Sequence, residues 1–378
     1  MGERRGVARA PPPIPELAMM PRVHLIALTL LLAACGTGHE SIEVRYDDAE
    51  QLRYTGRLQH LPSGVELADG QWQFWYANGE RQALGTFADG ALPTALDLNH
   101  GSTDIPRVGR SGHWSFWSEE GTLTAEGAYR DGARHGLWQT FWPDGRPHST
   151  GEFELGDATG VHQRWGEAGG LVAEMTYKDG LKHGMAREWS EDGALVRRGS
   201  YVADQRIGLH EVWNDDGVLI EQAEYVDGYL HGLRRTWDDA GCPTWAATYR
   251  GGEQHGPFRL YHDSGSIRQQ GDFSHGQQEG VLSAYDESGR CRWEYEYQDG
   301  EQEGRRTRWY ANGQKRSEGS FVDGLPLGLH SEWYPDGQLK SRGRYEGGRP
   351  VGRWHSWRRD GSLDERLSGE FGPGGAPR

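Results

Sequence analysis

The strongest constraint on the fold is a 24-residue period that runs through most of the chain. From Gly112 to Gly352, glycine recurs at every 24th position, which gives eleven anchor positions without a slip. A second glycine stands nine residues after each anchor, from Gly121 to Gly361. A repeat this regular indicates that each 24-residue copy is one supersecondary unit that packs on its neighbours. The sequence therefore predicts a stack of near-identical units and not a single central core.

Aromatic residues follow the same period in two columns. The first lies five positions after the anchors and the second, from Tyr129 to Tyr345, lies 17 positions after them. Gly70 and Trp75 fit the same template further upstream. We interpret the first column and the turn glycines as structural, and these positions include Trp117, Gly121, Trp165, Trp189, Trp213, Trp237, Trp309, Trp333, Gly337 and Trp357.

Two turn signals divide each copy into two short strands. In Tyr334-Pro335-Asp336-Gly337, Pro fixes φ, Asp bonds its own backbone and Gly accepts a positive φ. A second turn is signalled by pairs such as Asp323-Gly324. Turns every ten to fourteen residues leave no length for helices. We therefore expect an all-β fold, an elongated single-layer antiparallel β-meander of about twelve 24-residue hairpin repeats.

Alternation along each strand then predicts which side chains share a face. If Pro335–Gly337 is the loop, Trp333 stands opposite Leu339 and Leu329 stands opposite Gly343. This places Leu329, Trp333 and Gly343 on one aromatic and aliphatic face, where the glycines let rings lie flat on the backbone. The opposite face should be polar.

The N-terminal region reads as an export signal. Leu25 to Ala34 is apolar but far shorter than the roughly 20 residues that span a bilayer. The stretch Leu32-Ala33-Ala34-Cys35 resembles the bacterial lipobox, which implies lipid attachment at Cys35. Residues 1–18 are Pro-rich and include Glu16, which is unusual ahead of such an apolar run, so we expect translation to start at Met19 or Met20. Gly36 after the cysteine favours, by analogy with such lipoproteins, the outer membrane of a bacterial cell envelope. A plain secretory signal with an incidental cysteine is the alternative.

The period and these signals together predict the order of segments. Residues 1–34 form the signal region and 35–40 a lipidated linker. Residues 41–69 form a degenerate N-terminal capping repeat, and 70–371 form the repeat array with an insertion at 91–108. Residues 372–378 are expected to be a disordered tail.

Charge excludes one class of partner. The chain has 41 Lys and Arg against 56 Asp and Glu, a formal net charge of −15. Such a surface repels phosphates, so we expect no nucleic acid and no membrane contact beyond the lipid anchor. A basic protein or a neutral carbohydrate remains compatible with this charge.

No motif predicts catalysis, a cofactor or a metal site. His135, His183, His231 and His255 each precede an anchor, but equivalent positions lie about 9.6 Å apart, too far to share one zinc ion. A turn histidine that bonds backbone is the expected role. The insertion holds Asp97, His100, Ser102 and Asp104, whose order matches no nucleophile motif. Cys242 and Cys291 lie two copies apart, so we expect free thiols. The protein is predicted not to be an enzyme.

Aromatic residues outside the main columns are the candidate contact surface. Side chains two positions after the anchors are predicted to face away from the aromatic stripe. Side chains six positions after the anchors are predicted to lie on the same outward face. Aromatics on a polar face are candidate anchors for a protein or for flat sugar rings, and local packing between strands is the alternative. The set comprises Trp72, Tyr76, Trp114, Trp138, Trp142, Phe258, Tyr310, Tyr334 and Trp354.

The copy from Gly328 to Gly348 resembles the bacterial MORN-variant repeat that is typical of YwqK-family antitoxins, and the resemblance covers about Ser41 to Phe371. It implies an elongated β-sheet that binds or scaffolds, and the antitoxin label implies neutralisation of a toxin by direct contact. The export signal departs from a cytoplasmic antitoxin. We expect a non-catalytic, lipid-anchored protein that binds another protein, with toxin neutralisation as one form of that role. A carbohydrate- or cell-wall-binding protein and a structural envelope spacer are the alternatives.

Overall fold

The computed structural model describes residues 38–46, 51–63, 66–88, 105 and 107–377. Its regular elements are β-strands, and it divides into two compact units, which we call unit 1 (Met1–Arg146) and unit 2 (Pro147–Arg378). The expected signal region, Cys35 and most of the insertion at 91–108 lie outside the described residues. Within the described part of the chain, no helix is long and apolar enough to cross a membrane.

Unit 1 is a run of antiparallel strands in which each strand pairs with the next along the chain. Its buried core is aromatic and includes Tyr54, Trp72, Phe74, Phe87 and Trp114. The hairpin upstream of Gly70 is antiparallel, like those that follow it. The strands are β1 (His39–Arg45), β2 (Leu52–His60), β3 (Glu66–Trp75), β4 (Arg81–Phe87), β5 (Arg110–Trp117), β6 (Leu123–Arg130) and β7 (Ala133–Phe141).

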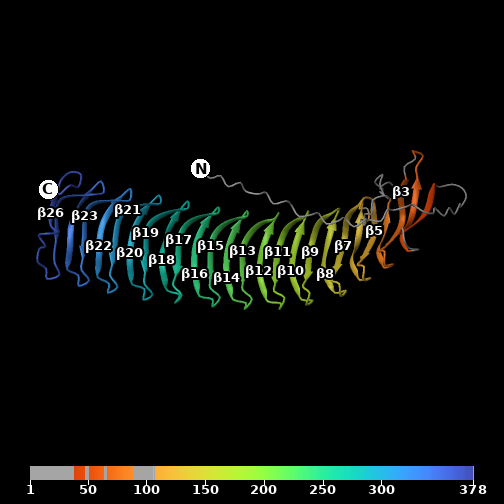
Figure 1. Ribbon diagram of the computed structural model, residues 1–378, viewed down its shortest axis with the longest axis horizontal. Helices are drawn as coiled ribbons and strands as arrows, with labels where there is room; N and C mark the ends of the chain where they lie inside the picture. The colour runs from red at the N-terminus through yellow and green to blue at the C-terminus, as the bar shows by residue number, and fades with distance from the viewer. Residues whose placement is uncertain (1–37, 47–50, 64–65, 89–104, 106, 378) are drawn as a thin grey trace, which may run out of the picture. The chain divides into compact units, whose positions relative to one another are not determined.

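Unit 2 continues the same pattern, and its strands lie side by side in chain order, from yellow to blue in Figure 1. The predicted all-β antiparallel meander is therefore confirmed in each unit. The strands are β8 (Pro147–Glu154), β9 (Asp157–Trp165), β10 (Leu171–Lys178), β11 (Leu181–Trp189), β12 (Leu195–Val202), β13 (Gln205–Trp213), β14 (Leu219–Val226), β15 (Tyr229–Trp237), β16 (Pro243–Arg250), β17 (Glu253–Tyr261), β18 (Ile267–Ser274), β19 (Gln277–Tyr285), β20 (Cys291–Gln298), β21 (Glu301–Trp309), β22 (Lys315–Val322), β23 (Leu325–Trp333), β24 (Leu339–Glu346), β25 (Arg349–Ser356) and β26 (Gly369–Phe371).

Both predicted turns are present. The Gly337 N–H donates to the Tyr334 carbonyl oxygen over 2.9 Å, and Gly337 has φ of +87°, as a three-residue loop ending in a left-handed residue requires. At the second turn Asp323 and Gly324 have φ of +51° and +72°. Two successive positive φ values define a type I′ turn, which explains why Asp-Gly and Gly-Gly pairs recur there.

The anchor glycines owe their regularity to backbone conformation inside the strand. Gly328 has φ of +71°, and all eleven anchors from Gly112 to Gly352 share a positive φ. Around Gly328 the ladder is irregular, because Glu318 pairs with Ser331 and Ser320 pairs with Leu327. Glycine adopts this left-handed conformation without the steric cost that a side chain imposes. The period is therefore the spacing of a β-bulge.

The predicted register is correct next to the loop and wrong beyond it. Trp333 does stand opposite Leu339, but Glu332 pairs with Ser341, so Lys340 is an extra residue in β24. This bulge shifts the register by one, and a shift of one moves every later side chain to the other face. Leu329 therefore stands opposite Arg344, while His330 stands opposite Gly343.

The two faces of the sheet must accordingly be redefined. The ring face carries the side chains two positions after the anchors, such as His330, together with Gly343 and Tyr345. The open face carries the side chains one position after the anchors, such as Leu329. Residues 372–377, expected to be a disordered tail, form a turn in which the Gly372 N–H donates to the Ala376 carbonyl oxygen over 2.8 Å.

Candidate interaction surface

On the ring face, a planar ring lies over a glycine of the neighbouring hairpin. A Cβ placed on Gly127 would come within 2.5 Å of the Trp138 ring, and one placed on Gly199 would come within 2.1 Å of the His210 ring. The His210 ring also meets the rings of Tyr201 and Tyr225 at 5.2 and 5.0 Å, in edge-on geometry. Ring, glycine and flanking aromatics thus form the packing unit that is repeated along the sheet.

Tryptophan and histidine both occur in this position, and both offer a ring N–H. Trp138 donates from Nε1 to the Ala128 carbonyl oxygen over 2.8 Å. His210 places Nε2 at 2.9 Å from the Ser200 carbonyl oxygen, so the donor is Nε2–H. The bond satisfies a carbonyl that lies beside the covered glycine. These rings are structural, and they hold one hairpin against the next.

The candidate contact residues two positions after the anchors lie on the packed side of the sheet. Trp72, Trp114, Trp138 and Phe258 are only 1%, 0%, 6% and 6% exposed. Trp354 is half-buried, with its ring centroid 5.0 Å from that of Tyr345. The outward placement was wrong because the extra residue in the second strand of each hairpin, Lys340 in the last full copy, brings these side chains onto the same face as the covered glycines. Local packing between strands, the alternative, is what the structure shows for these side chains.

The tyrosines of the candidate set tie one hairpin to the next. The hydroxyls of Tyr76, Tyr310 and Tyr334 donate to the carbonyl oxygens of Trp117, Trp333 and Trp357 over 2.8, 2.8 and 2.9 Å. Trp142 is half-buried. The tryptophan column expected to be structural is half-buried throughout, at Trp117, Trp165, Trp189, Trp213, Trp237, Trp309, Trp333 and Trp357.

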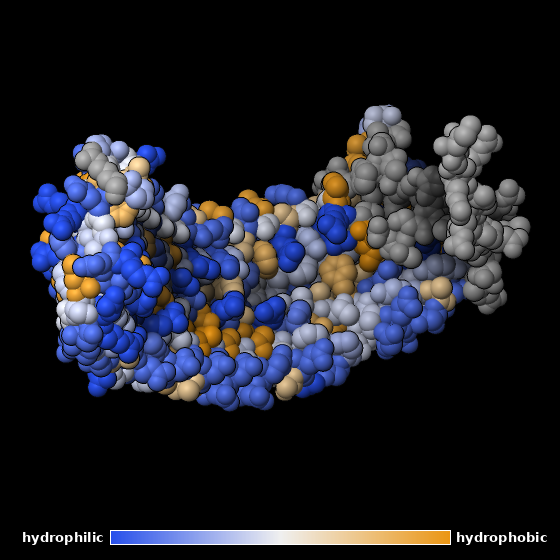
Figure 2. All heavy atoms as spheres, turned by 60° about the vertical axis from the view of Figure 1, so that its left-hand side comes forward, coloured by the Kyte–Doolittle hydropathy of each residue, from blue (hydrophilic) through white to orange (hydrophobic). Residues whose placement is uncertain are grey.

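The open face of unit 2 exposes large hydrophobic side chains, and those one residue after the anchors, such as Leu329, were expected on the packed stripe. Their positions are one residue before or after the anchors and beside the second turns. Figure 2 shows hydrophobic residues reaching the surface among hydrophilic ones. The first patch, which we call the central patch, comprises Leu181, Met185, Val202, Leu209, Val226 and Tyr229, exposed by 40–64%. The second, the distal patch, comprises Val322, Leu325, Leu327 and Leu329, exposed by 38–52%.

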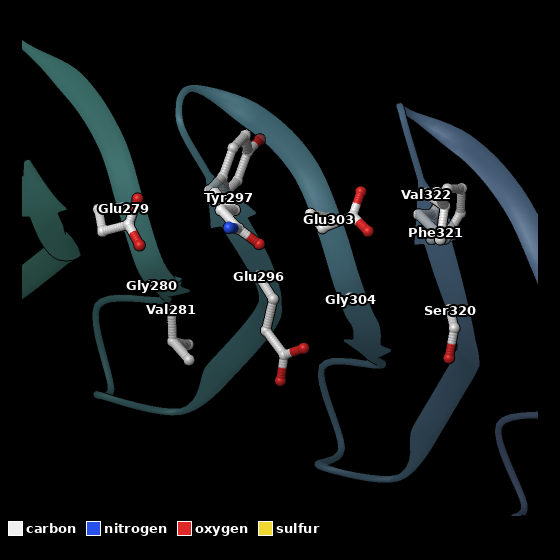
Figure 3. Close-up of a pocket in the computed structure, with 11 residues that line it drawn as sticks. Glu279, Gly280, Val281, Glu296, Tyr297, Glu303, Gly304, Ser320, Phe321 and Val322 are labelled. Atoms are coloured by element: carbon white, nitrogen blue, oxygen red, sulfur yellow. The ribbon is translucent and has the colours of Figure 1, made fainter.

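A shallow hollow of about 490 Å³ adjoins the distal patch. Glu279 on β19, Glu296 on β20 and Glu303 on β21 line it, and Figure 3 shows their carboxylates on these neighbouring strands. Val281 and Val322 complete its apolar wall. The hollow is therefore acidic and amphipathic, which suits a cationic group carried on an aliphatic stem.

Of the residues considered for a metal site or for catalysis, the structure describes the four histidines that precede anchors. The backbone nitrogen of His275 lies 3.5 Å from Nδ1 of His255, so this histidine faces backbone as expected. Nδ1 of His135, in contrast, is buried and has no hydrogen-bond partner among the described residues. No three His, Cys, Asp or Glu side chains of the described residues come together as a metal site would need. Asp97, His100, Ser102 and Asp104 lie outside the described residues.

Neither described cysteine forms a disulfide. Cys242 and Cys291 are free and half-buried. Burial, with a smaller effect from Glu294, raises the pKa of the Cys291 thiol to about 11. That thiol is protonated at neutral pH, and a protonated thiol is a poor nucleophile.

Acidification should weaken the packing unit around His210. Burial lowers the pKa of His210 below its ordinary 6.5, with a further contribution from Arg206, while the bond to Ser200 opposes the shift. The unfolded state then takes up the proton first as pH falls. The stabilisation by neutral His210 is complete above pH 6.5 and is lost as pH falls from there through the folded pKa.

Urea unfolding at pH 7.5 and 5.5 measures this loss. We expect His210→Trp, which installs the residue found at position 138, to reduce the difference between the two pH values. His275→Asn, at an exposed turn residue with φ of +49°, is the control for loss of a histidine as such. An unchanged pH difference in His210→Trp would contradict the assignment.

Comparison with known proteins agrees with the repeat. The model of the MORN repeat variant matches residues 68–89, 254–275, 302–323 and 326–346. The chain contains MORN-variant repeats. All four matched segments span the covered glycine or the anchor bulge of a hairpin, which are the features that the structure explains. None of the curated proteins matches this MORN-repeat chain.

Likeness to solved structures is weak. A crystal structure of TcdB2-TccC3 matches with 10% identity and a TM-score of 0.16, and it covers 84% of this chain and 20% of the other. A Tc holotoxin pore from Photorhabdus luminescens gives 12% identity, a TM-score of 0.17 and coverage of 89% and 22%. A porin-like protein from Bacteroides uniformis gives 9%, 0.15, 68% and 94%. The chain spans about a fifth of the length of the first two.

Proposed function

We propose that this MORN-repeat protein is a non-catalytic binding protein whose partner is another protein. The observation that carries the proposal is the central patch, in which Leu181, Met185, Leu209, Val226 and Tyr229 stand exposed on consecutive hairpins. Soluble proteins rarely leave contiguous apolar surface of this kind in water, and where they do it commonly marks an interaction site. The patch repeats with the hairpins, so it suits an extended partner surface.

Two further features define the setting of the proposal. The apolar run before Cys35 supports export and a lipid anchor in a bacterial envelope. The net charge of −15 favours a basic partner, because opposite charge accelerates encounter. Neutralisation of a basic toxin is the form of this function that combines both features.

The carbohydrate alternative loses the residues on which it rested. Trp72, Trp114 and Trp138 are packed within unit 1 and cannot stack on a sugar ring without unfolding their surroundings. A spacer without a specific ligand leaves the central patch without a purpose. Protein binding accounts for the exposed side chains and for the charge together.

Affinity purification of the tagged full-length protein from bacterial envelopes, followed by reconstitution with the purified partner, tests the proposal. We expect one stoichiometric protein, and we expect Leu209→Ser with Val226→Ser to weaken its binding about tenfold. Leu363→Ser with Leu367→Ser changes two exposed leucines outside the patch and should leave binding intact. If both double variants bind the reconstituted partner as tightly as the unchanged protein does, the central patch is excluded as the binding site. If no partner is found, the spacer is favoured.

A further inference from the structure

The hollow beside the distal patch brings charge and apolar surface together at one place on the open face. Its three carboxylates come from adjacent strands, and no Lys or Arg is among its lining residues. Val322 belongs both to the wall of the hollow and to the distal patch, so the two surfaces are continuous.

The three carboxylates are held in place by backbone. The Asp299 N–H donates to Oε2 of Glu279 over 3.1 Å, and the Asp323 N–H donates to Oε2 of Glu303 over 3.0 Å. The Arg305 N–H donates to Oε2 of Glu296 over 2.5 Å. Each of these bonds uses one oxygen, so each carboxylate keeps Oε1 as a second acceptor. Among the described residues, no Lys or Arg side chain forms an ion pair with these three carboxylates.

The neighbouring apolar side chains fix the direction in which a partner would continue. Leu325, Leu327 and Leu329 lie on the open face next to Val322 and are 52%, 41% and 43% exposed. Leu325 stands opposite Val322, and Leu327 opposite Ser320, which also lines the hollow. A segment that enters the hollow with one side chain therefore meets leucines with the next.

We propose that this hollow is a docking pocket for a basic side chain, lysine or arginine, of a protein partner whose flanking apolar residues cover the distal patch. The inference rests on the proposed protein-binding function and names the part of the surface that selects the partner. A basic stem fits because its methylenes contact Val281 and Val322 while its charge meets Glu279, Glu296 and Glu303. Charge complementarity excludes an acidic partner from the same site.

Binding of defined peptides to the purified full-length protein tests the pocket. The probes are three labelled 12-residue peptides of alternating Leu and Arg, Leu and Gln, and Ser and Arg, measured by fluorescence anisotropy at physiological salt. We expect the Leu-Arg peptide to bind at least about tenfold more tightly than either of the others, because only it offers both charge and apolar contacts.

Two matched triple variants separate the pocket from net charge. Glu279→Gln with Glu296→Gln and Glu303→Gln keeps an oxygen acceptor for each backbone N–H and should weaken the Leu-Arg peptide about tenfold. The control removes three exposed carboxylates of the first-turn edge, Glu167→Gln with Asp192→Asn and Asp215→Asn, and should weaken it less than about twofold. Circular dichroism and thermal melts of both triples confirm that each is folded.

The outcomes distinguish this inference from the function on which it rests. Equal loss in the two triples, or equal affinity for the Leu-Arg and Ser-Arg peptides, overturns the pocket and leaves only general electrostatics. If a reconstituted envelope partner binds the pocket triple as well as it binds the unchanged protein, the pocket is wrong and protein binding stands. If no partner exists, the proposed function fails whatever the peptides do.

Discussion

Trp114→Ala is expected to destabilise unit 1 by about 3–5 kcal/mol, the range for removing a large buried aromatic side chain. Trp114 is 0% exposed. Its ring centroid lies 5.1 Å from that of Phe87 and 5.8 Å from that of Phe116, and the guanidinium carbon of Arg110 lies 4.8 Å from it. Its Nε1 donates to the Thr86 carbonyl oxygen over 3.0 Å. Truncation therefore removes packing, a cation–π contact and a hydrogen bond together.

Urea unfolding followed by circular dichroism measures this loss, with Trp117→Ala as the matched control. Trp117 is the same residue type on the same strand but is half-buried, so we expect about half the cost or less. Equal losses for the two variants would refute the assignment of Trp114 to the core. A ligand that Trp114→Ala ceases to bind would report the unfolding of unit 1 and not a contact with that tryptophan.

The turns and the hairpins could be predicted because glycine and aspartate encode them locally. Tyr334-Pro335-Asp336-Gly337 and Asp323-Gly324 specify their φ values through residue type, so the strand count and the antiparallel order followed. The anchor glycine was visible as a period, and the structure supplies its cause, a positive φ inside each strand.

The faces could not be predicted in the same way, because the extra residue at Lys340 carries no special φ and leaves no mark in composition. Counting outward from the loop without it placed Leu329 on the packed side and the Trp114 position on the surface. The open face and its hollow were missed for the same reason, since a periodic Val or Leu beside a glycine has the same pattern whether it is packed or exposed.

One signal in the sequence does report the true faces. Where the residue under the ring is small, the residue that covers it is large, and the reverse also occurs. Gly127 lies under Trp138, whereas at the equivalent positions two copies later Met175 stands opposite Ala186. At Tyr295 both partners are large, and the guanidinium carbon of Arg306 lies 4.5 Å from the tyrosine ring centroid. Such reciprocal sizes indicate contact, and they would have paired these two columns on one face.

The second prediction with a large effect is that a substitution at Trp138 rescues the stability lost by a substitution at Gly127. Gly127→Met should destabilise unit 1 by about 3 kcal/mol or more, because a Cβ there would already lie 2.5 Å from the Trp138 ring. Gly127 has no left-handed φ, so the cost arises from steric contact and not from backbone strain. Gly369→Ala, whose added Cβ meets nothing within 4 Å, should change stability by less than about 0.5 kcal/mol.

The double variant Gly127→Met with Trp138→Ala recreates the pair found at Met175 and Ala186. Trp138→Ala alone should cost about 3–5 kcal/mol, because it empties a buried site and removes the bond to Ala128. In the double variant the methionine fills the space that the ring leaves, so the two changes together should cost about 2 kcal/mol less than the sum of the single changes. Additive losses in a double-mutant cycle would mean that the two side chains do not share one volume. In that case the ring-over-glycine contact would not be what holds neighbouring hairpins together.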